Sequence, residues 1–156
     1  MSATPDAPVE PPRGQLIRWS PQAMALGMET VATQFAQATL KVPYRPDLVG
    51  DPDRGVIAGG VVTTLLDHAC GHAVAMAMAE AGPVATLDLR IDYMRAAEPG
   101  LDVHAHAHCY KLTHAIAFVR ATAYDRDPSD PVATAQAVFM LTGVGPEPVS
   151  DGEAGA

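Results

Sequence analysis

The chain has 156 residues, 48% of them apolar, and a formal net charge of −8 at pH 7. This length suits one domain with a single core, and the acidic balance argues against a nucleic-acid partner, because phosphate binding requires a basic face. The two cysteines, Cys70 and Cys109, lie in apolar or strand-like segments that do not resemble a disulfide framework or a zinc ribbon. We therefore expect a soluble, cytoplasmic protein.

The two ends of the chain differ in composition from the rest. Residues 1–15 are rich in proline and acidic side chains, which predicts a disordered lead-in without the apolar segment of a signal peptide. Residues 144–156 are rich in glycine, proline and acidic residues and predict a flexible tail. The stretch between them, residues 16–143, is expected to form the single domain.

The first structured element is predicted after Ser20. Ser20 suits a helix N-cap and Pro21 suits the first helical position, so we expect a helix, or two short helical turns, up to about Gln37. Residues 39–44 alternate in polarity and predict one strand, which a loop connects to Gly55.

Residues 55–80 form the longest apolar run of the chain and contain no proline. Gly59 and Gly60 open this run and Ala-Gly-Pro at residues 81–83 closes it, which predicts a helix. Apolar residues point in nearly every direction around its axis, so we expect the helix to be buried on all sides. Its charged and imidazole side chains make a membrane span costly, and no membrane partner is expected; they are Asp67, His68, His72 and Glu80.

Asp67 is the one acidic residue in the middle of this helix. Because burying a carboxylate without a partner is costly, Asp67 is expected to be either a satisfied structural acceptor or a functional group. The open N–H groups of the first helical turn, at Gly59 and Gly60, carry positive partial charge and could hold an oxyanion. A plain helix–loop junction is the alternative interpretation of the two glycines.

Four strand-like segments follow the helix, at residues 86–94, 101–110, 115–124 and 132–141. The first alternates cleanly and is expected to present one apolar face, made of Leu87, Leu89, Ile91 and Tyr93. A long apolar helix followed by an antiparallel meander predicts an α+β fold in which the sheet curls around the helix.

The histidines invite a metal hypothesis, which the spacing does not favour. His104, His106 and His108 share one strand face, where only Asp102 could complete a ligand set, so we expect no metal and a solvated or subunit-contact face. His68 and His72 share a helix side, but no glutamate follows His68, so this is not the zinc-protease motif. One of these two histidines could line a pocket.

Three segments together resemble a known family. They are Gly59 to Asp67 (Gly-Gly-Val-Val-Thr-Thr-Leu-Leu-Asp), residues 86–100 (which begin Thr-Leu-Asp-Leu-Arg-Ile-Asp-Tyr) and Ala-Ile-Ala-Phe at residues 115–118. They are similar to hotdog-fold acyl-CoA thioesterases of the phenylacetic-acid-degradation (PaaI) and 4-hydroxybenzoyl-CoA thioesterase type, over residues 40–142. The resemblance implies a curved antiparallel sheet around one central helix and edge-to-edge dimers that often form tetramers, with active sites at the subunit interface.

The resemblance also implies roles for individual residues. Asp67 would be the general base or nucleophile, the Gly59 N–H, with help from Gly60, would polarise the thioester carbonyl, and Thr86 would orient water from the facing subunit. No separate cofactor is expected, because coenzyme A is part of the substrate. An acidic protein must supply local positive charge to coenzyme A phosphates, and we expect it above all from Arg90 and Arg95, of which Arg95 is the best candidate. Further candidates are Lys111, Arg120 and Arg126.

Two positions depart from the family pattern. A polar residue of the loop before the helix, often Asn or Gln in the family, falls at about Pro52 or Asp53 here. A histidine commonly precedes the two glycines, whereas this chain has Ala58. The sequence thus predicts an acyl-CoA thioester hydrolase that works as a dimer or tetramer. The alternative that Ala58 makes plausible is a non-catalytic acyl-CoA-binding or regulatory module of the same fold.

Overall fold

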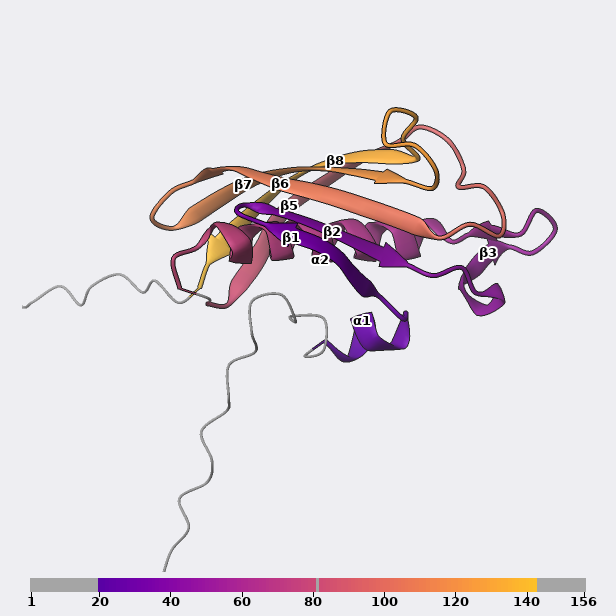
Figure 1. Ribbon diagram of the computed structural model, residues 1–156, viewed down its shortest axis with the longest axis horizontal. Helices are drawn as coiled ribbons and strands as arrows, with labels where there is room; N and C mark the ends of the chain where they lie inside the picture. The colour runs from indigo at the N-terminus through magenta and orange to yellow at the C-terminus, as the bar shows by residue number, and fades with distance from the viewer. Residues whose placement is uncertain (1–19, 81, 143–156) are drawn as a thin grey trace, which may run out of the picture.

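The computed structural model describes residues 20–80 and 82–142 (Figure 1). The predicted lead-in of residues 1–15 and the predicted tail of residues 144–156 lie outside the described residues. No helix in the described part of the chain is long and apolar enough to cross a membrane.

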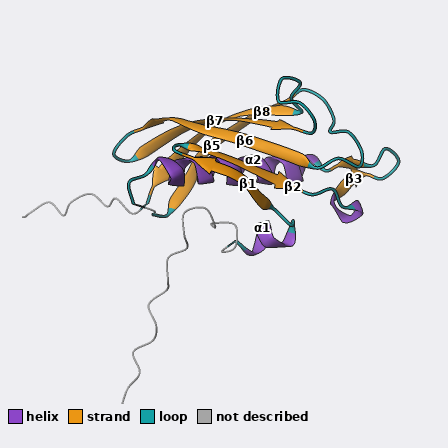
Figure 2. Ribbon diagram, viewed as in Figure 1, coloured by secondary structure: helices purple, strands orange, loops and turns teal. Residues whose placement is uncertain are grey.

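The described elements are arranged as one long helix against one large antiparallel sheet (Figure 2). Their order is α1 (Pro21–Ala25), β1 (Glu29–Gln34), β2 (Gln37–Val42), a 3-10 turn (Pro46–Leu48), β3 (Val49–Asp51), β4 (Val56–Ile57), α2 (Gly59–Ala77), β5 (Val84–Tyr93), β6 (Val103–Leu112), β7 (Ile116–Tyr124) and β8 (Ala133–Leu141). The sheet has the strand order β1-β2-β6-β7-β8-β5, and β3 pairs with β4 separately. The predicted α+β hotdog architecture is confirmed.

The segment before the central helix differs from its prediction. The Ser20 side chain accepts a hydrogen bond from the Ala23 N–H (3.2 Å), as expected of an N-cap, but the helix ends at Ala25 and does not reach Gln37. Gly27, with a φ of 68°, turns the chain, and residues 29–34 then form β1, which pairs with β2. The prediction of helix here, and of a single strand before the central helix, was therefore wrong.

Small side chains bring the sheet close to α2. Buried alanines occupy the helix-facing positions of β6, β7 and β8, namely Ala105, Ala107, Ala117, Ala121, Ala123, Ala133, Ala135 and Ala137. Against them α2 buries a continuous stripe, namely Val62, Leu65, Leu66, Ala69, Cys70, Ala73 and Val74. The spacing of three and four residues along this stripe is that of one helix face.

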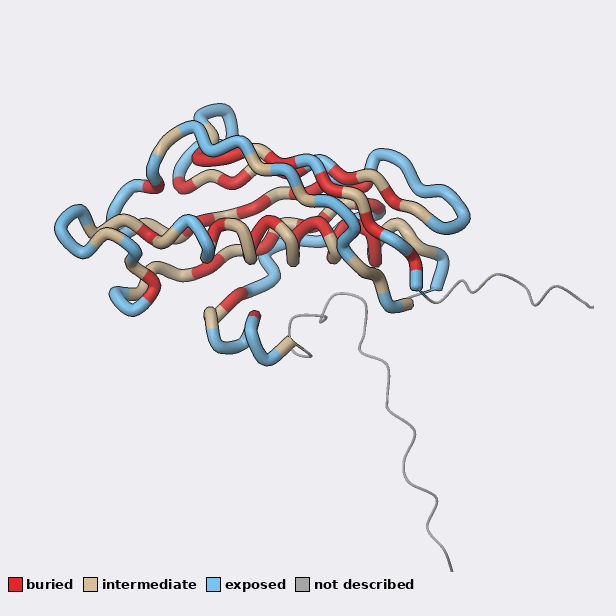
Figure 3. The backbone as a smooth tube through the Cα atoms, turned by 180° about the vertical axis from the view of Figure 1, so that it is seen from behind, coloured by how far each residue is buried: buried red, intermediate tan, exposed pale blue. Residues whose placement is uncertain are grey.

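The opposite side of α2 is not buried within one chain. Gly59 and Gly60 are exposed, and Thr63, Asp67 and Gly71 are half-buried (Figure 3). The expectation of a helix buried on all sides was therefore wrong for the single chain, because the sheet covers only one side of the helix. The uncovered side carries the candidate site residues.

A β-bulge interrupts the alternation of β5. Thr86 pairs with Phe139 and Asp88 pairs with the adjacent Val138, so Leu87 is an extra residue in β5. Leu89 and Ile91 pack against the core and Tyr93 reaches the start of α2, whereas Leu87 is 54% exposed. The predicted common face of these four residues was wrong at Leu87, because strand periodicity does not reveal a bulge.

Candidate active site

Asp67 lies on the uncovered side of α2 and has one strong partner. The Thr86 hydroxyl on β5 donates a hydrogen bond to Asp67 Oδ1 over 2.8 Å. No described group hydrogen-bonds the second carboxylate oxygen, Oδ2. Both residues line a pocket of about 290 Å³, whose wall also includes His68, His72 and Phe139. One carboxylate oxygen is thus held in place while the other is available to a water or a ligand.

The bulge at Leu87 explains why Thr86 reaches Asp67. In regular alternation Thr86 would share the outer sheet face with Asp88 and Arg90, because residues two apart point the same way. The extra residue turns Thr86 to the side of α2, opposite the buried Phe139. We expected Thr86 to act from the facing subunit, but the structure joins it to Asp67 of its own chain.

The two histidines of the helix form part of the pocket wall. His72 Nδ1 lies 2.8 Å from the His68 carbonyl oxygen, and because a carbonyl only accepts, Nδ1 carries the proton. Burial lowers the pKa of both imidazoles. Cys70 faces the core instead, where burial raises the pKa of its thiol to about 12, so it is not a nucleophile at neutral pH.

The start of α2 forms a second candidate region. Ala58 is the N-cap and offers no side-chain hydrogen bond, and its carbonyl accepts from the N–H groups of Val61 and Val62. No described residue accepts a hydrogen bond from the N–H groups of Gly59 and Gly60. A pocket of about 360 Å³ adjoins this helix start. Exposed N–H groups at the positive end of a helix are suited to bind a carbonyl oxygen that develops negative charge.

The two regions are too far apart to act on one bond from a single chain. Gly59 and Asp67 are eight residues apart, which corresponds to about 12 Å along the helix axis. The pockets at Asp67 and at Gly59 share no lining residue. A thioester carbonyl that contacted both would therefore require a second copy of the chain.

A tyrosine that the sequence did not single out completes the helix start. Tyr93, at the end of β5, donates its hydroxyl hydrogen bond to the Gly59 carbonyl oxygen (2.8 Å). Its hydroxyl also lies 2.6 Å from Thr63 Oγ1. Sequence reasoning placed Tyr93 only on an apolar strand face, since the contact joins residues 34 positions apart.

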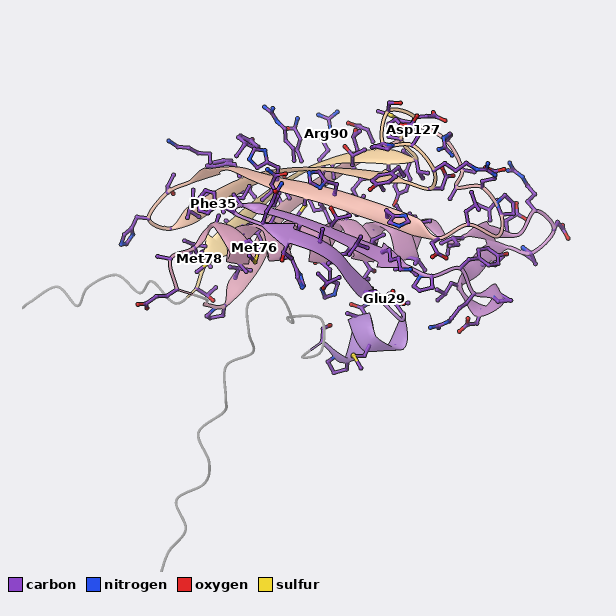
Figure 4. All side chains as sticks on the ribbon, in the orientation of Figure 1. Glu29, Phe35, Met76, Met78, Arg90 and Asp127 are labelled. Atoms are coloured by element: carbon purple, nitrogen blue, oxygen red, sulfur yellow. The ribbon has the colours of Figure 1, made fainter. Side chains whose placement is uncertain are left out.

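The two arginines proposed for phosphate binding lie in different surroundings. Arg95 makes two hydrogen bonds to Asp125, of 2.8 and 2.7 Å, and a further ion pair with Asp130, so few of its donors remain for a phosphate. The Arg95 guanidinium holds the pKa of the Asp125 carboxyl well below its usual range. Arg90 projects from the outer face of the sheet, away from α2, and pairs with Asp92 (Figure 4).

A polar cavity adjoins the helix-start pocket and holds another basic residue. The cavity measures about 510 Å³ and has three arginines and four carboxylates in its wall, namely Arg54, Arg95, Arg126, Glu98, Asp125, Asp127 and Asp130. Arg126 pairs with Glu98, whereas Arg54 forms no ion pair with a described carboxylate. Arg54 is thus a phosphate-binding candidate that the sequence did not indicate.

The strand histidines lie on the outer face of the sheet, as predicted. His104 stacks on Tyr124 with ring centroids 5.4 Å apart, and His106 Nδ1 lies 2.9 Å from the Thr39 hydroxyl. Asp102, the one carboxylate considered for a ligand set, instead accepts from the Tyr44 N–H and from Lys41. Across residues 20–80 and 82–142 no group of three or more histidine, cysteine or acidic side chains is placed to hold a metal ion.

A six-stranded antiparallel sheet packed on one long helix defines a protein of the hotdog-fold class. Residues 54–132 match the family described as the thioesterase superfamily. The chain belongs to this family.

Similar proteins match this chain over most of its length. A "putative esterase" of Pseudomonas aeruginosa is 32% identical over 126 residues, which cover 81% of this chain and 92% of that protein. A crystal structure of a Pseudomonas aeruginosa protein has 37% identity and a TM-score of 0.75, covering 82% of this chain and 96% of that one. A mutant of the phenylacetic acid degradation protein PaaI from Thermus thermophilus has 26% identity and a TM-score of 0.67, covering 78% of this chain and 98% of that one.

Proposed function

We propose that the protein hydrolyses acyl-CoA thioesters to a free acid and coenzyme A, with Asp67 as its catalytic carboxylate. The observation that carries this proposal is the Thr86–Asp67 hydrogen bond, which fixes Oδ1 and leaves Oδ2 without a described partner beside a pocket. A thioester is an activated acyl group, so a positioned base and oxyanion donors suffice for its hydrolysis.

The chemical steps follow from these groups. Asp67 Oδ2 takes a proton from water, and the hydroxide oxygen bonds to the thioester carbon to form a tetrahedral oxyanion. Helix-start N–H groups stabilise that oxyanion. The carbon–sulfur bond then breaks, the sulfur takes up the proton from Asp67, and the acid is released. In the variant mechanism, Asp67 attacks the carbon directly, the carbon–sulfur bond breaks and the coenzyme A thiolate leaves. Water then cleaves the resulting anhydride, which releases the acid and restores the Asp67 carboxylate, and a proton from that water passes to the thiolate.

Two copies of the chain are needed for this site. Gly59 and Asp67 lie about 12 Å apart on one helix. The N–H groups of one copy would therefore stabilise the oxyanion that forms beside the Asp67 carboxylate of another copy. Strand β5 is an edge of the sheet and exposes Leu87 and Tyr93, and Met94 directly after it is exposed as well, which supports edge-to-edge pairing there. A two-fold axis across this edge makes the two α2 helices antiparallel, so each helix start approaches the partner's carboxylate. Two such dimers could form the predicted tetramer.

The pockets divide the substrate between them. A pocket of about 290 Å³ is far too small for coenzyme A and fits an acyl group. We place the phosphates of coenzyme A near the cavity at the helix start, where Arg54 is a basic residue without an ion pair to a described carboxylate.

The two buried free cysteines, Cys70 and Cys109, suit the reducing cytoplasm, which we propose as the location of the protein.

The rival function is a binding or regulatory module, and turnover separates the two. Thiol release is measured across benzoyl-, phenylacetyl- and straight-chain acyl-CoAs, with Asp67→Asn in parallel. Asp88→Asn is the matched control, because Asp88 is an exposed carboxylate on the neighbouring strand. We expect Asp67→Asn to lower kcat at least ~100-fold and Asp88→Asn to leave it unchanged. Saturable binding without turnover of any thioester would support the module.

A further inference from the structure

The hydroxyl of Tyr93 contacts the backbone and one side chain of the helix start. It donates to the Gly59 carbonyl oxygen over 2.8 Å, and the Thr63 hydroxyl lies 2.6 Å from it and 3.1 Å from the same carbonyl oxygen. Tyr93 is 51% exposed, so its ring adds less to the core than a buried tyrosine would. This placement suggests that its contact with the helix start has a role beyond packing.

The contacted carbonyl belongs to the same peptide plane as a free donor. The Gly59 C=O and the Gly60 N–H are the two ends of one planar trans peptide and point in opposite directions. A hydrogen bond to the carbonyl therefore fixes the direction of the N–H and, by polarising the peptide, strengthens it as a donor. Gly60 is exposed, and a Cβ built there would meet nothing within 4 Å.

The next peptide along the helix provides a contrast within the same turn. The Thr64 hydroxyl donates to the Gly60 carbonyl oxygen over 2.9 Å. The N–H of that peptide belongs to Val61 and is already bound to the Ala58 carbonyl oxygen at 3.0 Å. Polarising the Val61 N–H therefore cannot help to bind a ligand, because this N–H already has an acceptor. Of these two peptides, the one that Tyr93 holds has the N–H without a described acceptor.

We infer that Tyr93 is a positioning residue that makes the Gly60 N–H a second donor to the thioester oxyanion. The inference rests on the proposed thioesterase function, because the developing negative charge is what the second donor would stabilise. Tyr93 itself does not touch the reacting atoms. Thr63 supports it by hydrogen bonding to its hydroxyl.

The test is Tyr93→Phe, which removes the hydroxyl and keeps the ring. We expect kcat to fall roughly three- to tenfold while KM stays within about twofold, since the lost interaction is weak in the bound thioester and stronger in the transition state. Infrared spectra provide a readout that a merely structural residue would not change. In an Asp67→Asn background, the carbonyl band of a bound ¹³C-labelled thioester should move back toward its position in water when Tyr93→Phe is added.

The controls separate this inference from the proposed function. Thr64→Val removes a hydroxyl from the neighbouring peptide and should leave kcat unchanged. If Tyr93→Phe loses stability or assembly, Thr63→Val replaces it and must give the same loss of kcat. Unchanged kcat in these variants, an equal loss in Thr64→Val or an unmoved carbonyl band would overturn the role of Tyr93. Absence of turnover in the wild type would instead overturn the proposed function.

Discussion

The two halves of the candidate site lie on one helix but are built by different means. At Asp67 side chains carry the chemistry, and the direction of the Thr86 side chain depends on the bulge in β5. At Gly59 backbone N–H groups carry it, and side chains act there only by positioning the backbone, as the Tyr93 hydroxyl does at the Gly59 carbonyl. Different substitutions should therefore disable each half. Side-chain changes should disable the first, whereas the second should be disabled by loss of an N–H and only weakened by loss of the Tyr93 hydroxyl.

The largest effect is expected from Gly59→Pro, which removes the donor without removing the helix. Proline suits the first helical position, and Ala58, with a ψ of 136°, has the extended backbone that precedes proline. We expect kcat to fall by roughly 100- to 1000-fold. Gly59→Ala is the control, because it keeps the N–H and its Cβ meets Tyr93 only at a van der Waals distance of 3.8 Å. A similar loss in both variants, at unchanged melting temperature, would contradict a role for the N–H.

A smaller effect is expected at the side-chain half from Thr86→Val. This change removes the hydroxyl that donates to Asp67 and keeps a β-branched residue of similar shape. Losing a hydrogen bond to a charged group should lower kcat about tenfold. Thr86→Ser restores the hydroxyl and should recover most of the activity. Steady-state kinetics that rank serine no better than valine would assign Thr86 to packing alone.

Outside both halves, the Arg95–Asp125 ion pair should affect stability and not chemistry. The Asp125 side chain is only 2% exposed, and removing its charge leaves the Arg95 guanidinium poorly paired. We expect Asp125→Asn to lower the free energy of unfolding by about 2–3 kcal/mol in urea titrations. The kcat of the folded variant should be unchanged. A tenfold loss of kcat without loss of stability would place this pair in the site.

The same ion pair predicts a dependence of stability on pH. The pKa of Asp125 is lowered in the folded protein, so the carboxyl binds protons more weakly there than in the unfolded chain. Its stabilising contribution is therefore complete above the unfolded pKa of about 4 and is lost as the pH falls below that value. Urea titrations between pH 5 and pH 2 should show a steeper loss in the wild type than in Asp125→Asn. Equal pH dependence of the unfolding free energy in the two proteins would contradict the contribution of Asp125.

The smallest effect is expected from Arg54→Gln, next to the helix start. Loss of one exposed phosphate contact should raise KM for an acyl-CoA two- to fivefold, at unchanged kcat. A truncated thioester of N-acetylcysteamine lacks the phosphates, so its KM should not change. Arg90→Gln tests the position that the sequence suggested. A larger effect at Arg90 than at Arg54 would move the phosphates to the outer face of the sheet.

The sequence predicted the parts of this site that depend on local pattern. Gly59 to Asp67 could be placed on one helix, and a charge in an apolar run drew attention to Asp67. The direction of the Thr86 side chain could not be predicted, because the bulge exists only through pairing with β8. Likewise, the partner of Arg95 is 30 residues away, and the exposed strand at residues 29–34 has no alternating burial that a pattern could reveal.

The central claim is that the carboxylate of one copy and the helix start of another act on the same thioester, and subunit complementation tests it directly. Asp67→Asn and Gly59→Pro chains, each inactive alone, are unfolded together, refolded at equal concentrations and assayed for thiol release. Half of the random dimers contain both chains, and each of these holds one intact site, so we predict about a quarter of the wild-type activity. Activity no greater than the sum of the two separate variants would contradict a site shared between copies.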